Sequence, residues 1–552
     1  MYSSLKGLKT DEQVELLTRE LVKMKSYNST AGERDKADFI LEILQSFPYF
    51  STHKKFAWSV DIENDTLNRK NVFAFIKGKN DSSRTIIYHA HLDTVGTEDF
   101  GGLQSIAHDP AALQDFFTSY EGDKEVKTDA LSGEWLFGRG ALDMQSGIAV
   151  HLANLLYFSE HPEELNGNLL IMFNPDEENQ HTGIRTSLLE LKKLQAEHSL
   201  EYVAAINNDF ISPLYDGDTT KYIYTGVAGK LLPCFHIFGR EAHVGDNLAA
   251  IDPTLIASEL NLRIGQNLEF SEKIQGEVIL PPTCLYMRDD KKSYDVQTAV
   301  SSKLYFNYFV YTKTPKQVLD EMYSVAVDVC NNFENTKKRA YHEFCDMTDL
   351  PKRDLEWKLE VLKLEDYINY LDGLNLSPNK VISETLKKFK HEIHDDRMLA
   401  FKIVEALHLL DPEKKPRVIL FFAPPFLPSN FLKEADQKGE FIYHSVRAEL
   451  EQAEYKEVQF TIKKYFPFLS DGSFLSYNGS EEDILSIKNN FPAMDQLFHL
   501  PLKEMKELDI PSINLGVYGK GGHQWTERVY KPYTFDVLPK LIRNVTKRLL
   551  HK

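Results

Sequence analysis

The chain alternates short, almost wholly apolar runs with stretches of helical periodicity. Asn168–Asn174 (NLLIMFN) and Tyr202–Asn207 (YVAAIN) are two such runs, and Ser146–Phe158 (SGIAVHLANLLYF) shows the helical spacing. Runs without polar positions suit strands that helices bury on both faces. Their alternation with helices predicts an α/β fold with a mostly parallel central sheet and helices on both faces.

The pattern changes after Lys221. Lys230–Phe238 is typical of a strand and Pro253–Ile264 of a helix, and the segment has the size of a small α+β domain, which we expect to be ferredoxin-like. Because apolar runs return at Arg417–Phe422 and Ser512–Val517, we predict an α/β domain that this insertion splits. The predicted ranges are 1–221 for the first α/β segment, 222–345 for the insertion, and 346–552 for the second α/β segment, with a helical extension at about 346–416.

The charge of the chain argues against two classes of partner. The sequence has 64 Lys and Arg against 82 Asp and Glu, a formal net charge of −18. Affinity for nucleic acids and for anionic membranes depends on cations, so we expect neither partner. The N-terminal residues lack the apolar region of a signal peptide, and the four cysteines form no C-x-x-C pair. We therefore expect a cytoplasmic protein with reduced thiols.

Polar residues with metal-binding chemistry stand where several predicted strands end. These residues are His91, Glu177, Glu178, Asp209 and His523. Each is a weak signal alone, because histidines and acids are common in surface loops. Ligands of open α/β sheets bind at the carboxyl ends of the strands, so these loops are expected to converge. Asp143 precedes the helix that begins at Ser146 and is expected to join them.

Two imidazoles and several carboxylates predict a zinc site, with manganese or cobalt as alternatives. If Asp143 bridges, the set can serve two metal ions. Glu177 neighbours the candidate ligand Glu178, so its carboxylate can face the reacting water and take its proton. Asp93 can hydrogen-bond the free ring nitrogen of His91 and fix its tautomer.

Five segments together resemble one known family. They are HAHLDTVG (His89–Gly96), GRGALDMQSGIAVHL (Gly138–Leu152), NPDEENQHTG (Asn174–Gly183), IFGREAHVGDN (Ile237–Asn247) and VYGKGGHQWTERV (Val517–Val529). In this order they are similar to the M20 family of zinc peptidases and amidohydrolases. The length of the chain and the wording of the motifs most resemble the arginine-utilisation branch of that family.

The resemblance implies two zinc ions per chain and a role for each residue of the site. It implies that one zinc is held by His91, Asp143 and Asp209, and the other by Asp143, Glu178 and His523. It further implies that Glu177 is the general base and proton shuttle, and that Asp93 orients His91.

The resemblance also implies that the inserted domain is a lid that forms a homodimer. In family dimers, the histidine that matches His243 reaches the active site of the partner and polarises the scissile carbonyl, which stabilises the developing oxyanion. Asn307 in the lid, together with Gly521 and Gly522 beside His523, are candidates for contact with the substrate.

These features predict a metal-dependent hydrolase that cleaves an amide bond of a small peptide or an N-acyl amino acid, and the branch resembled implies arginine catabolism. Two alternatives stay open. One is an aminopeptidase or dipeptidase that needs a free α-amine, and the other is a non-catalytic binding or regulatory protein on a hydrolase scaffold. No G-x-S-x-G segment follows a predicted strand, which argues against a serine hydrolase.

Overall fold

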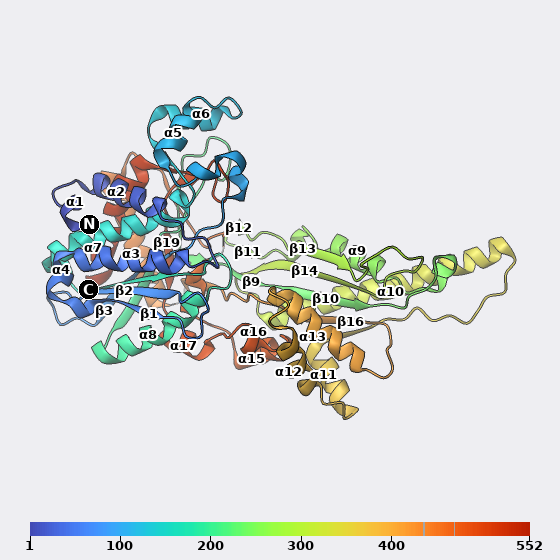
Figure 1. Ribbon diagram of the computed structural model, residues 1–552. Helices are drawn as coiled ribbons and strands as arrows, with labels where there is room; N and C mark the ends of the chain where they lie inside the picture. Colours follow the sequence, from blue (N-terminus) through green and yellow to red (C-terminus); the bar gives the residue numbers. More distant parts are fainter. Residues whose placement is uncertain (434–435, 469, 552) are drawn as a thin grey trace. The chain divides into compact units, whose positions relative to one another are not determined.

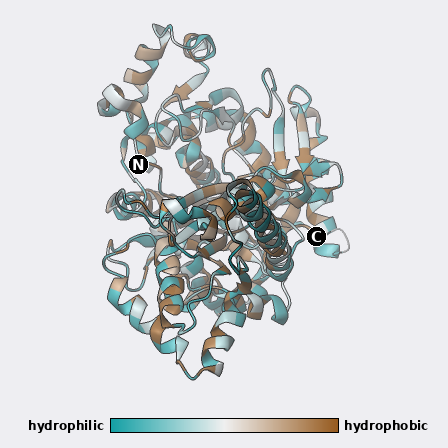
Figure 2. Ribbon diagram, turned by 90° about the vertical axis from the view of Figure 1, so that its right-hand side faces the viewer, coloured by the Kyte–Doolittle hydropathy of each residue, from teal (hydrophilic) through white to brown (hydrophobic). Residues whose placement is uncertain are grey.

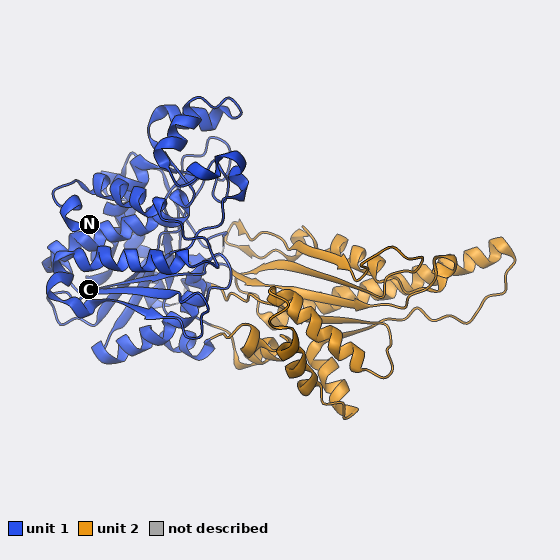
Figure 3. Ribbon diagram, in the orientation of Figure 1, with its two compact units in different colours: residues 1–228, 430–477, 501–552 blue, residues 229–429, 478–500 orange. Residues whose placement is uncertain are grey.

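A computed structural model describes residues 1–433, 436–468 and 470–551 of the chain. These residues form two compact units (Figure 3). Unit 1 comprises Met1–Ala228, Asn430–Tyr477 and Pro501–Lys552, and unit 2 comprises Gly229–Ser429 and Asn478–Leu500. No helix of the described residues is long and apolar enough to cross a membrane.

Unit 1 is built on an eight-stranded sheet (Figure 1). In spatial order its strands are β1 (Ala57–Asp61), β2 (Lys70–Ile76), β5 (Asn168–Asn174), β3 (Arg84–His91), β6 (Glu201–Asn207), β19 (Ser512–Leu515), β7 (Lys221–Tyr224) and β18 (Phe460–Lys463). The central pairs β5–β3, β3–β6 and β6–β19 are parallel. The carboxyl ends of these four strands therefore lie at one edge of the sheet.

Helices cover both faces of this sheet. Neighbouring residues of a strand point to opposite faces, so both faces carry apolar side chains that need cover. Tyr88 of β3 stacks on His151 of α7 and contacts Thr546 of α18 through its hydroxyl group. The next residue, His89, points the other way, toward the segment that includes Asp471. The longer helices of unit 1 are α2 (Thr10–Lys23), α3 (Gly32–Ser46), α5 (Pro110–Thr118), α6 (Lys124–Ser132), α7 (Ser146–Glu160), α8 (Thr182–His198), α14 (Gln437–Leu450), α17 (Leu502–Leu508) and α18 (Leu538–Leu550).

The predicted fold class is confirmed. The run Asn168–Asn174 forms β5 without a shift, and Tyr202–Asn207 forms β6 with one added residue. Every residue of β5 is buried, as expected for a strand that helices cover on both faces. Most helices carry both hydrophilic and hydrophobic residues in Figure 2, which is the pattern of helices that pack on one side.

Unit 2 contains a sheet in the spatial order β13 (Thr283–Asp289), β14 (Ser301–Val310), β10 (Pro233–Phe238), β16 (Arg417–Phe422) and β15 (Glu360–Lys363), and β9 (Gly229–Leu231) also pairs with β14. Helix α9 (Pro253–Ile264) joins β10 to β13, and α10 (Pro315–Thr348) follows β14. The pairs β13–β14, β14–β10 and β10–β16 are all antiparallel. This order is that of a ferredoxin-like split βαβ unit with β16 as its last strand.

The predicted place of Arg417–Phe422 is wrong. The sequence pattern assigned this run to the second α/β segment, 346–552, but the strand pairs with β10 in unit 2. A run that is apolar on both faces suits either sheet, so its composition could not decide between them. The prediction for 346–416 changes with it. This region holds β15, α11 (Leu364–Gly373), α12 (Pro378–Phe389) and α13 (Asp396–Leu410), and it belongs to unit 2.

The first predicted boundary also shifts. Lys221–Tyr224 forms β7 of the unit 1 sheet, so unit 1 continues to Ala228 instead of ending at residue 221. Residues 434–435, 469 and 552 fall within the predicted range 346–552 and lie outside the described residues.

The core of unit 2 contains a buried histidine that supports a prediction. His236 of β10 is fully buried against Phe238 and Phe401, and within the described residues neither of its ring nitrogens has a hydrogen-bond partner. Burial holds the pKa of His236 well below its ordinary value. The unfolded chain binds a proton there below about pH 6.5, whereas the folded chain does not. The stability of the fold therefore decreases as the pH falls through that value.

We expect His236→Leu to raise the free energy of unfolding by about 1 kcal/mol at pH 8, because an unpaired buried polar group is removed. The gain should grow by about 1.4 kcal/mol for each pH unit below about 6.5. Urea unfolding at several pH values measures both effects. The same substitution at the exposed His391 is the control. A gain that does not change with pH would contradict the argument.

Candidate metal centre

Six polar side chains converge at the carboxyl edge of the unit 1 sheet. His91 is the last residue of β3, Glu177 and Glu178 follow β5, Asp209 follows β6, Asp143 precedes α7, and His523 lies between β20 (Gly519–Lys520) and β21 (Arg528–Tyr530). Their ligand-type atoms form three groups of neighbours within 4.8 Å. The groups are His91 with Asp143 and Asp209, His91 with Glu177 and Glu178, and Asp143 with Glu178 and His523.

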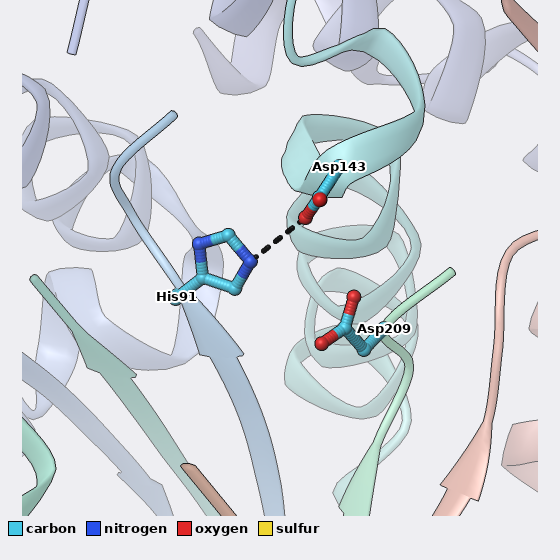
Figure 4. Close-up of side chains that lie close together, drawn as sticks. All are labelled: His91, Asp143 and Asp209. Atoms are coloured by element: carbon cyan, nitrogen blue, oxygen red, sulfur yellow. Dashed lines mark hydrogen bonds and ion pairs between the residues drawn. The ribbon is translucent and has the colours of Figure 1, made fainter. Parts of the chain in front are cut away.

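The first group is almost inaccessible to solvent. His91 Nε2 lies 3.0 Å from Asp143 Oδ1, and the Asp209 carboxylate points toward them from the end of β6 (Figure 4). The exposed fractions are 3% for His91, 6% for Asp143 and 4% for Asp209. An imidazole and two carboxylates are thus held together away from bulk water.

The third group, Asp143 with Glu178 and His523, shares Asp143 with the first. His523 Nε2 lies 2.9 Å from Asp143 Oδ2 and 2.9 Å from Glu178 Oε1, while the other oxygen of Asp143 faces His91. One carboxylate therefore has an oxygen in each group, which is the arrangement of a residue that bridges two metal ions. His523 is the most exposed of the three, with 48% of its side chain accessible.

The charges of the cluster are only partly balanced. Burial and the neighbouring Asp143 raise the pKa of Asp209 to about 8, and the same two causes raise the pKa of Glu178. Burial, and then Glu178, raise the pKa of Glu177 well above its ordinary value. Hydrogen bonds to Asp143 and Glu178 raise the pKa of His523 to about 11. These three acids thus give up their protons at higher pH than free carboxyl groups do, because burial and neighbouring negative charge both disfavour the ionised form.

This donor set fits divalent metal ions. Imidazole nitrogens and carboxylate oxygens are the ligands that zinc takes in catalytic sites, and manganese and cobalt accept them as well. The carboxylates that repel one another without a cation would be neutralised by one. The cluster therefore supports a metal cofactor.

Asp93 lies against His91, as the prediction requires, and it has a second set of contacts that the sequence did not predict. The ring nitrogen Nδ1 of His91 lies 3.1 Å from the main-chain oxygen of Asp93 and 3.6 Å from its carboxylate. The carboxylate instead accepts hydrogen bonds from the backbone N–H groups of Glu177, at 3.1 Å, and Glu178, at 3.0 Å. Asp93 thus orients His91 through its backbone and holds the loop that presents both acids.

Sequence reasoning missed a buried ion pair behind Asp143. Glu527 Oε1 accepts hydrogen bonds from the backbone N–H groups of Leu142, at 2.9 Å, and Asp143, at 3.1 Å. Its other oxygen lies 2.7 Å from Arg139 Nη1, and both side chains are 1% exposed. The signal in the sequence is the presence of Arg139 and Glu527 inside the two motifs that contain Asp143 and His523.

The remaining candidates lie outside this cluster. His243 and Asn307 belong to unit 2, where His243 is exposed and its Nδ1 accepts a hydrogen bond from the Gly245 N–H, and Asn307 lies in β14. Their predicted roles and the predicted homodimer stay predictions. Gly521 and Gly522 precede His523. A side chain at Gly522 would meet the ring of Phe210 at 3.0 Å, so the glycine lets this loop approach the segment that follows Asp209.

Comparison with known proteins agrees with this description. The family model of Peptidase family M28 matches residues 71–229, which include β2, β3, β5 and β6. The chain is 51% identical to the protein RocB of Bacillus subtilis over 550 residues, which cover 100% of this chain and 97% of RocB. The chain belongs to the RocB family. RocB and this chain therefore share a fold over their whole length, including the region that holds α11, α12 and α13.

Two more distant likenesses complete the comparison. A succinyl-diaminopimelate desuccinylase of Wolinella succinogenes is 28% identical over 191 residues, which cover 34% of this chain and 48% of that enzyme. The crystal structure of a tripeptidase from Staphylococcus aureus has the same fold, with a TM-score of 0.50 at 14% identity, and covers 98% of this chain and 99% of that one. The match to Peptidase family M28, together with the donor cluster in unit 1, indicates that this RocB-family chain is an enzyme of the metallopeptidase type.

The ion pair of Arg139 and Glu527 behind Asp143 supports a prediction about metal affinity. We expect Glu527→Gln to weaken metal binding about 10–100-fold, because the loop that presents Asp143 loses its charged acceptor. Titration of the metal-free protein with Zn²⁺ measures this change. Glu449→Gln is the matched control, since Glu449 is also a buried acid paired with an arginine, Arg548, on other helices of unit 1. Equal affinities in both variants would show that Glu527 does not support the site.

Proposed function

We propose that this RocB-family chain is a hydrolase that uses two zinc ions to cleave an amide bond of a small peptide or an N-acyl amino acid. The observation that carries the proposal is the cluster of two imidazoles and four carboxylates at one edge of the unit 1 sheet. Asp143 has an oxygen in each of two donor groups, and Glu177 is a further carboxylate beside them. Two metal ions and one general base account for all six side chains.

The ligands follow from the groups of neighbours. His91, Asp143 and Asp209 would hold one metal ion, and Asp143, Glu178 and His523 would hold the other. When bound, the metal ions supply Lewis acidity, which makes water a nucleophile near neutral pH and polarises the scissile carbonyl group. Asp93 and Glu527 contribute by fixing the backbone of the two loops that carry Glu178 and Asp143.

Glu177 is the one carboxylate of the six side chains that is not a proposed ligand, and we assign the proton transfers to it. Its backbone is held by Asp93, the residue is 8% exposed, and its carboxylate lies beside His91 and Glu178. From this place it would take a proton from the attacking water and deliver it to the nitrogen of the leaving amine. A carboxylate that accepts and then donates the same proton serves both halves of amide hydrolysis without another acid.

The substrate class is proposed from several likenesses. The motifs resemble the M20 family, and their likeness to its arginine-utilisation branch favours a place in arginine catabolism. The partial match to a succinyl-diaminopimelate desuccinylase favours an N-acyl amino acid. The alternative is an aminopeptidase or dipeptidase of the same family. The two differ in whether the substrate keeps a free α-amine.

A substitution at Glu177 tests the chemistry. We expect Glu177→Gln to lower kcat by at least about 10²-fold, because removal of a general base costs on the order of 10²–10⁴. Metal content should stay near that of the wild type, since no ligand is lost. Steady-state kinetics and elemental analysis of the same samples measure both quantities. Full activity in this variant would rule out Glu177 as the base.

A substrate screen with the metal-loaded protein tests the substrate class. We expect turnover of N-acyl amino acids, including arginine and ornithine derivatives, and loss of that turnover after chelation, with recovery on addition of Zn²⁺. Free dipeptides serve as the matched set. Preference for the free α-amine would select the alternative, and inactivity toward both sets with full metal content would favour a non-catalytic protein.

A further inference from the structure

A buried histidine–aspartate pair lies beside Glu177. His181 Nδ1 is 2.8 Å from Asp471 Oδ1, and both residues are 2% exposed. Ligand-type atoms of Glu177, His181 and Asp471 lie within 4.8 Å of one another. Neither His181 nor Asp471 belongs to the groups that contain His91 or His523.

Asp471 is held in place from several directions. Its Oδ2 atom lies 3.8 Å from Nε2 of His89, which is two residues before His91 in β3. The preceding residue, Ser470, accepts a hydrogen bond of 2.8 Å from Asn207 at the end of β6. The following residue, Gly472, accepts one of 2.8 Å from Asn430 through its carbonyl group. The backbone that carries Asp471 is therefore tied to β6 through Ser470, and its carboxylate lies beside β3.

His181 is fixed to the loop that carries Glu177. Its backbone N–H donates a 2.7 Å hydrogen bond to the carbonyl group of Asp176, and its ring packs on Phe474. Its φ of 55° and the φ of 72° at Asp176 are both in the left-handed region. Residues other than glycine seldom adopt this conformation. It is typical of loops that place a functional group.

Stability alone does not account for the pair. A buried charged pair contributes little net stability, because the loss of hydration offsets the attraction. The pair joins His181, near Glu177 in the sequence, to Asp471, almost 300 positions later in the chain. It lies where the side chain of a general base needs a fixed orientation. Placement errors of about 1 Å in a reacting group can cost on the order of 10²-fold in rate.

We propose that Asp471 and His181 are positioning residues that hold the side chain of Glu177 in the place from which it acts on the substrate. Asp471 sets the orientation of the His181 imidazole, and the imidazole limits the positions open to the neighbouring carboxylate. The inference rests on the proposed function, because it assigns Glu177 the transfer of protons. The same three donors could instead bind a further metal ion, and the test below separates the two readings.

The experiment compares variants of the metal-loaded, full-length protein. The variants are Asp471→Ala, His181→Ala, the double variant, Asp471→Asn, and Glu449→Ala as a control at another buried, paired acid of unit 1. The measurements are kcat and KM for a substrate from the screen, metal content, thermal unfolding, and the crystal position of Glu177 in Asp471→Ala. The crystal position does not depend on activity.

We expect each alanine variant to lower kcat by about 10–100-fold with little change in KM or metal content. The double variant should be no worse than the more affected single variant, because both residues act through one contact. Asp471→Asn should recover part of kcat, since its side-chain oxygen can still accept a hydrogen bond from His181. In the crystal, Glu177 should leave its wild-type position. Glu449→Ala should lower stability alone.

Three results would overturn the proposal. One is a wild-type kcat in the alanine variants, or a loss that merely follows stability as in the control. Another is the loss of one metal ion per chain from both variants, which would make the cluster a metal site. The third is an unmoved Glu177 in the crystal. If the wild type turns over no substrate, the proposed function fails, but the position of Glu177 still decides whether the pair holds it.

Discussion

The repulsion between four buried carboxylates is the constraint on which unit 1 depends. Asp143, Glu177, Glu178 and Asp209 approach one another at a place where water screens their charges poorly. His91 and His523 offset part of this charge, while burial, and after it the neighbouring carboxylates, raise the pKa values of Glu177, Glu178 and Asp209. The chain folds these groups together at a cost that divalent cations would remove.

The constraint explains how the surrounding backbone is built. The Asp93 carboxylate accepts hydrogen bonds from two backbone N–H groups of the loop after β5. Glu527 accepts hydrogen bonds from two backbone N–H groups of the loop before α7. Each anchor comes from a different part of the chain than the loop it holds. Glu527 places a further negative charge behind the cluster, and the guanidinium group of Arg139 neutralises that charge. The site therefore forms only when distant segments have come together.

Unit 2 holds three helices inside its ferredoxin-like order of strands, apart from the cluster in unit 1. The helices α11, α12 and α13 lie between α10 and β16, inside a ferredoxin-like order of strands. Only β16, the last strand of that order, follows the added helices. The insertion changes the path of the chain in unit 2, whereas the ligands and their supports all belong to unit 1.

The sequence by itself determined the class of the fold and the residues of the cluster. Apolar runs such as Asn168–Asn174 can be stable only between layers of helices, and polar residues after such runs must meet at one edge of a parallel sheet. The tertiary structure alone decided which sheet takes Arg417–Phe422, since an apolar strand matches either one. It also revealed that Asp93 binds the backbone of Glu177 and that Asp471 pairs with His181. Partners so far apart along a chain leave no local pattern, because hydrogen bonds depend on distance in space.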